Sequence, residues 1–127
     1  MALLATVFIG ITALLHVYIF IMESIQWRQP AIWKRFGITS QADADTIAVM
    51  AYNQGFYNLF LAIGAALGLI LYWSSAHQAG LALAAFTSAS IVLAAIVLLT
   101  SGGKRLRPAL VQGVPALLGL VFLLLAG

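Results

Sequence analysis

The stretch AGLALAAFTSASIVLAAIVLLT, residues 79–100, holds no charged side chain. A helix needs roughly 20 mostly apolar residues to cross the hydrocarbon core of a bilayer. Three further apolar stretches of comparable length occupy about residues 3–25, 46–73 and 109–126. The sequence therefore predicts an all-α fold, an integral membrane four-helix bundle that forms a single transmembrane domain over residues 1–127.

The composition of the chain agrees with this fold class. Of the 127 residues, 64% are hydrophobic and 7% are charged, whereas a soluble domain carries about 25% charged residues. These values exclude a water-soluble globule and a disordered chain. The first apolar stretch has no basic segment before it and no small-residue cleavage pattern after it, so we expect a retained helix rather than a signal peptide.

The basic residues indicate how the chain crosses the membrane. All six lie in the loops before the second and fourth apolar stretches: Arg28, Lys34, Arg35, Lys104, Arg105 and Arg107. Both loops fall on one side of the bundle, and Lys and Arg mark cytoplasmic loops. We expect a multi-pass protein of the inner (plasma) membrane with both termini outside the cytoplasm. The net charge of +3 then reflects topology, so the expected partner is the lipid bilayer and not a nucleic acid.

The first of these loops contains the sequence PAIWKRFG, residues 30–37. Proline favours the first turn of a helix, and the apolar residues of this segment fall on the side opposite the basic ones. This pattern predicts a short amphipathic helix, about residues 30–36, that lies in the membrane interface. We expect the interfacial side chains to be Trp27, Trp33 and Phe36.

The second long helix has its own start signal. Ser40 and Asp43 resemble a capping box. A helix that began near Gln41 would be longer than the hydrocarbon core of about 30 Å, so its first turns should project into the cytoplasm. Further along, Gly64 and Gly68 form a small-residue pair that predicts close packing of helices.

Ionisable side chains inside a membrane helix are costly and indicate functional sites. The first stretch holds His16 and Glu23, which are two helical turns apart and would face the same way on an α-helix. The second stretch gathers amides and phenols around Gly55, whose missing side chain lets a backbone or a ligand approach. We expect one polar, ligand-binding cavity in the cytoplasmic half of the bundle, lined by His16, Glu23, Asn53, Gln54, Tyr57, Asn58 and Gln112.

We expect this cavity to hold neither a metal ion nor another cofactor. A zinc site needs three or four protein ligands, and the cavity offers one histidine and one glutamate. The chain has no cysteine, which excludes thiolate ligands and disulfides.

Three segments carry a resemblance to a known family: HVYIFIMESIQW (residues 16–27), P-x-x-W-x-x-F-G (residues 30–37) and YNQGFYNLFLAIG (residues 52–64). With them the chain resembles, over essentially its whole length, the integral membrane family catalogued as domain of unknown function 1304. The resemblance implies a four-helix membrane protein and brings no established activity. The motif positions that it implies are His16, Glu23, Trp27, Trp33, Asn53, Gln54, Gly55, Tyr57 and Asn58.

A looser likeness connects the chain to the proteobacterial antimicrobial compound efflux family, whose members also have four helices. Their His…Phe-Glu motif is similar to His16, Phe20 and Glu23, although the spacing from histidine to glutamate is longer here. Their Trp-Asn…Asn motif is similar to Asn53 and Asn58, with tyrosine in place of tryptophan. The repeat of the acidic motif is absent, because the last two stretches contain no acid.

Three functions fit these residues. The first is proton-coupled transport or binding of a small organic or lipid-like molecule, with Glu23 exchanging a proton for the ligand in a homo-oligomer. The second is an intramembrane enzyme of the isomerase, hydrolase or lyase type on a small hydrophobic substrate, with His16 and Glu23 as candidate catalytic acid and base. The third is a structural or regulatory membrane subunit. The first accounts best for one carboxylate opposite an amide-rich helix.

Overall fold

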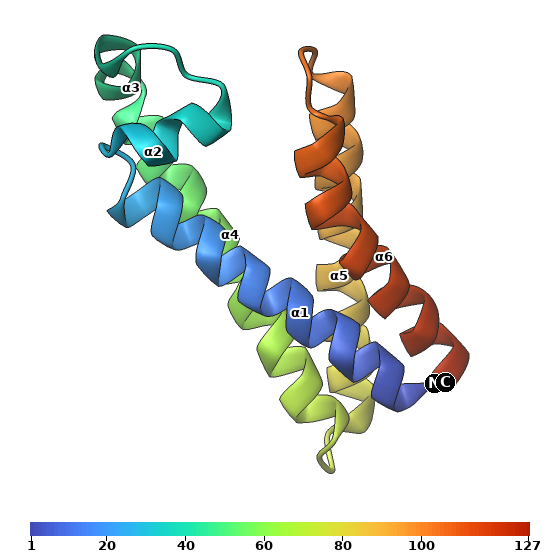
Figure 1. Ribbon diagram of the computed structural model, residues 1–127. Coiled ribbons are helices and arrows are strands. Elements are labelled where there is room, and N and C mark those ends of the chain that lie inside the picture. The colour runs from blue at the N-terminus through green and yellow to red at the C-terminus, as the bar shows by residue number, and fades with distance from the viewer. The chain divides into compact units, whose positions relative to one another are not determined.

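The computed structural model describes all residues, 1–127, and consists of eight helical segments without a strand (Figure 1). The segments are α1 (Ala2–Phe20), the π-helical turn η1 (Ile21–Ile25), α2 (Pro30–Trp33), the 3-10 turn η2 (Lys34–Phe36), α3 (Gln41–Thr46), α4 (Ala48–Tyr72), α5 (His77–Thr100) and α6 (Leu106–Ala126). The prediction of an all-α fold is confirmed.

Four spans are long and apolar enough to cross a membrane: Ala2–Ile25, Ala48–Tyr72, His77–Thr100 and Leu106–Ala126. The prediction of four membrane helices is therefore confirmed, and the chain is a multi-pass membrane protein. The last helix begins at Leu106, earlier than expected from the apolar pattern. Pro108 fits its first turn because the N–H that proline lacks has no partner within the helix there.

The chain forms two compact units. Residues 1–15 and 61–127 make up the first, which we call the hairpin unit. Residues 16–60 make up the second, which we call the cap unit. Each is described by itself.

Small residues bring the helices of the hairpin unit together. A Cβ at Gly68 would lie 2.7 Å from the backbone nitrogen of Ala84, and one at Gly64 would lie 2.9 Å from Thr87 Oγ1. The Gly64 and Gly68 pair of α4 thus packs against α5 of the same chain. Ala84 is also part of the buried core of this unit, beside Ala65 of α4.

The cap unit folds as its local signals predict, with one exception. Pro30 opens α2, Gly37 ends η2 with a φ of 80°, and Ser40 Oγ accepts a hydrogen bond of 3.1 Å from the backbone N–H of Asp43. The second long helix is not continuous from its capping residue, however. Ile47, with φ −98° and ψ 7°, separates α3 from α4, so the expected cytoplasmic extension is a separate short helix.

Two tryptophans hold the cap unit together. Trp27 and Trp33 are buried in one cluster with Ala44. The Nε1–H of Trp27 donates to the carbonyl oxygen of Ala44 at 2.9 Å, and that of Trp33 donates to Gln41 Oε1 at 3.3 Å. Phe36 packs edge-on against Trp27, with ring centroids 5.2 Å apart. These three aromatic side chains therefore pack within the protein, and their position at the membrane interface stays a prediction.

Candidate ligand site at Glu23

Glu23 lies in the π-helical turn that follows α1. The backbone N–H of Gln26 donates to the carbonyl oxygen of Ile21 at 2.9 Å, five residues earlier. Such turns are rare and occur frequently at functional sites. Because a π-helical turn contains more residues than an α-helical one, Glu23 is rotated out of the regular two-turn register with His16 that an uninterrupted helix would have.

The carboxylate of Glu23 accepts a hydrogen bond from one side chain of α4, that of Asn58. Asn58 Nδ2 donates to Glu23 Oε1 at 2.9 Å and to the backbone oxygen of Gln54 at 3.0 Å. Both side chains are buried, with 7% of Glu23 and 8% of Asn58 exposed. An amide nitrogen has two hydrogens, so Asn58 is fully used as a donor. The second carboxylate oxygen of Glu23 accepts no hydrogen bond from the protein.

A pocket of about 290 Å³ opens beside this carboxylate within the cap unit. Glu23 is its one acidic residue, and Arg28 is its one basic residue. Arg28 is largely exposed and lies 3.8 Å from Asp45, which partly compensates its charge. The other lining residues are apolar, aromatic or small: Ser24, Ile25, Trp27, Ala48, Val49 and Tyr52. The pocket thus offers one buried acid in a mostly apolar wall, which is typical of small-molecule sites.

Close backbone contact holds the site together. Figure 1 shows the end of α1 beside α4, and Ser24 Oγ donates across this contact to the carbonyl oxygen of Tyr52 at 2.8 Å. A Cβ at Gly55 would collide with Ser24 Oγ and lie 2.9 Å from Ser24 N. Glycine is therefore needed here so that the backbone of η1 can approach α4.

The other three α4 residues expected in the cavity do not pair with Glu23. Asn53, Gln54 and Tyr57 have exposed side chains on the cap unit. Helical periodicity explains the difference, since residues one, four and five positions from Asn58 point about 100°, 40° and 140° away from it. One amide of three is therefore paired with the acid.

His16 and Gln112 also differ from Glu23 in their surroundings. His16 is buried, with 1% of its side chain exposed, and precedes the π-helical turn on the same span. Gln112 lies in α6 and belongs to the hairpin unit. Its share in the Glu23 site stays a prediction.

The sequence analysis missed Ser24, which lines the pocket and bonds to α4. A signal for it was present. Small residues mark places where membrane helices approach closely, and Ser24 directly follows the only acid of the first span.

Fold and site together define a class, the small multi-pass membrane protein with a buried carboxylate–amide pair beside a pocket. The chain belongs to the family described as protein of unknown function (DUF1304), whose family model matches residues 10–124. The resemblance to this family is thereby confirmed. No curated protein and no solved structure matches the chain.

Proposed function

We propose that the protein binds a small organic molecule in the pocket at Glu23 and exchanges it for a proton. The observation that carries this proposal is a carboxylate, 7% exposed, of which one oxygen is held by Asn58 and the other is left for a ligand. Burial of an ionised group without full compensation is unfavourable by several kcal/mol. Membrane proteins tolerate such groups mainly where they serve a function.

The hydrogen bond from Asn58 is compatible with both states of the acid. A protonated carboxyl group still has an oxygen that accepts, so Asn58 Nδ2 can stay on Glu23 Oε1 in either state. The proton then sits on the other oxygen, which is also the atom left for a ligand. A ligand with a cationic or hydrogen-bond-donating group therefore competes with the proton for one atom. Such competition is what proton-coupled exchange requires, and since four helices are few for a path, we expect a homo-oligomer.

The surroundings of Glu23 support binding more than acid–base catalysis. Both hydrogens of Asn58 are already used, so this amide has no donor left to stabilise negative charge on a substrate, as an oxyanion site must. The amides of Asn53 and Gln54 are exposed elsewhere on α4.

The orientation that we propose follows from the two basic loops and places both termini outside the inner (plasma) membrane. The cap unit, with Arg28, Lys34 and Arg35, then faces the cytoplasm. The pocket at Glu23 would thus be loaded from that side.

The test of the proposed function is the small-molecule content of the purified protein. Wild type, Glu23→Gln and Asp43→Asn are purified in a mild detergent, and bound compounds are extracted and identified by mass spectrometry. Asp43→Asn is the matched control, because it removes one exposed acid of the cap unit that does not line the pocket.

We expect one compound to be retained by wild type and by Asp43→Asn and to be lost from Glu23→Gln. Acidification should release the same compound from wild type, because protons compete for the carboxylate. Equal content in all three proteins, or no bound compound in any of them, would contradict the proposal.

A further inference from the structure

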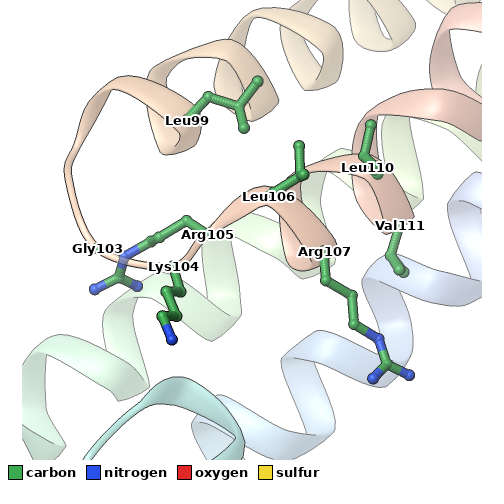
Figure 2. A pocket seen from close by; sticks show the side chains of 8 residues that line it. All are labelled: Leu99, Gly103, Lys104, Arg105, Leu106, Arg107, Leu110 and Val111. Carbon is green, nitrogen blue, oxygen red and sulfur yellow. The ribbon is translucent and has the colours of Figure 1, made fainter.

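The ends of α5 and α6 and the loop between them form a second pocket of about 610 Å³, which lies within the hairpin unit (Figure 2). It combines four aliphatic with three basic side chains: Leu99, Leu106, Leu110, Val111, Lys104, Arg105 and Arg107. Figure 2 shows that the charged ends of the basic side chains project away from Leu99 and Leu106. The pocket thus has an apolar part and a strongly positive part.

The basic side chains of this pocket have no acidic side chain in their own unit. The three acids of the chain, Glu23, Asp43 and Asp45, all belong to the cap unit. Arg105 Nε donates to the carbonyl oxygen of Gly102 at 3.3 Å, and Lys104 and Arg107 make neither an ion pair nor a hydrogen bond through their side chains. Three adjacent like charges repel one another, so a bound anion would stabilise this loop.

The other basic loop has partners within the protein. Arg28 lies 3.8 Å from Asp45, and Arg35 donates to the hydroxyl of Tyr18 at 2.8 Å. The Lys34 ammonium lies 5.7 Å from the centre of the Trp33 ring. A role in membrane orientation applies to both loops alike, so it does not explain why Lys104 and Arg107 alone have no partner and line a pocket.

We propose that this pocket binds the phosphate headgroup of an anionic phospholipid. Both α5 and α6 are long enough to cross the membrane, so the loop that joins them lies at a membrane surface, at the level of the headgroups. Basic pockets between membrane helices recognise anionic headgroups, and the arginine guanidinium matches phosphate oxygens in pairs. Leu99, Leu106 and Leu110 then contact the part of the acyl chains next to the headgroup.

The test compares two matched double variants. Each variant removes one lysine and one arginine. Lys104→Gln/Arg107→Gln changes the two side chains of the pocket that have no partner, and Lys34→Gln/Arg35→Gln changes two side chains of the other loop that have one. Each protein, in a neutral detergent, is titrated with dioleoyl phosphatidylglycerol or with dioleoyl phosphatidylcholine, and the lipid adducts are quantified by native mass spectrometry. A third titration adds millimolar glycerol 3-phosphate as a competitor, which distinguishes a lipid from a free phosphate ester.

We expect wild type to prefer phosphatidylglycerol. Lys104→Gln/Arg107→Gln should weaken its binding by about 30-fold, since each basic residue near an anionic surface contributes about fivefold. Lys34→Gln/Arg35→Gln should weaken it much less, and glycerol 3-phosphate should not compete. A charge-preserving variant, Lys104→Arg/Arg107→Lys, should bind nearly as wild type does, which separates loss of charge from loss of fold.

Three results would overturn the proposal. Equal loss in both double variants would mean a general attraction to positive charge rather than a built pocket. Equal binding of the two lipids would mean that the headgroup is not recognised. Competition by glycerol 3-phosphate would assign the pocket to a soluble phosphate ester instead of a lipid.

Discussion

Replacement of Gly55 by alanine tests whether α4 and the π-helical turn of Glu23 touch at the backbone. A Cβ at position 55 would collide with Ser24 Oγ, and it would lie 2.9 Å from Ser24 N and 3.0 Å from Ser24 Cβ. Carbon atoms in favourable contact are about 3.5–4.0 Å apart. The two elements must therefore move apart, and Glu23 must move away from Asn58 with them.

The size of the effect follows from three contributions. Forcing an extra methyl group into a packed site is unfavourable by about 1–3 kcal/mol. Separation also weakens the hydrogen bond from Ser24 to Tyr52, and bonds of this kind between membrane helices average about 0.6 kcal/mol. Alanine in place of helical glycine recovers roughly 0.5–1 kcal/mol. The free energy of unfolding of Gly55→Ala should therefore fall by about 1–3 kcal/mol.

The assay is reversible unfolding in mixed micelles of a mild detergent and SDS, followed by circular dichroism. Gly10→Ala is the control, because a Cβ at Gly10 of α1 would meet nothing within 4 Å. The same substitution there should raise the free energy of unfolding by roughly 0.5–1 kcal/mol. Ser24→Ala/Gly55→Ala should recover part of the loss, since the hydroxyl is removed while the backbone nitrogen remains. If Gly55→Ala proves as stable as wild type, the reasoning is refuted.

Three further predictions address the pairing, the cap unit and the topology. Asn58→Leu should lower the free energy of unfolding by about 1–3 kcal/mol. The same substitution should lower it less when Glu23 is already replaced by glutamine. If the effects of the two substitutions simply add in a double-mutant cycle, Glu23 and Asn58 do not pair directly. Trp27→Phe keeps an aromatic ring but removes the donor to an α3 carbonyl. Thermal unfolding should therefore show a stability lower by about 1 kcal/mol. Unchanged stability would mean that this hydrogen bond does not stabilise the cap unit. Since the chain has no cysteine, a membrane-impermeant maleimide added to spheroplasts should label Ser75→Cys and spare Ser101→Cys; the reverse pattern would invert the proposed orientation.

The π-helical turn shows where sequence reasoning stopped. Glu23 was identifiable because an acid in an apolar span is conspicuous without any knowledge of the fold. Its partner was not, because Asn53, Gln54 and Asn58 are the same kind of donor, and Gln54 and Asn58 lie four residues apart on nearly the same face of α4. The rotation of α4 against η1 selected Asn58, and the approach of Ser24 to Gly55 defines that rotation.

The cap unit shows a second limit. Pro30, Gly37 and Ser40 act locally, through the backbone angles and hydrogen bonds that they favour, so the sequence predicted their roles. The roles of Trp27 and Trp33 within the protein were not predicted. Both rings are buried in one cluster, and both N–H groups donate to α3. This packing depends on how α2 and α3 meet, and it leaves the predicted position of these residues at the membrane interface untested.

The sequence by itself therefore determined that the chain is a four-span membrane protein. Hydropathy and charge act over one helix at a time, so a local pattern suffices. Tertiary structure alone decided that Glu23 meets Asn58, that a pocket opens beside them, and that Arg28, Lys34 and Arg35 have partners whereas Lys104 and Arg107 have none. Each of these depends on which faces of separate segments meet, and that choice is made by the sum of many small packing contacts far apart in the chain.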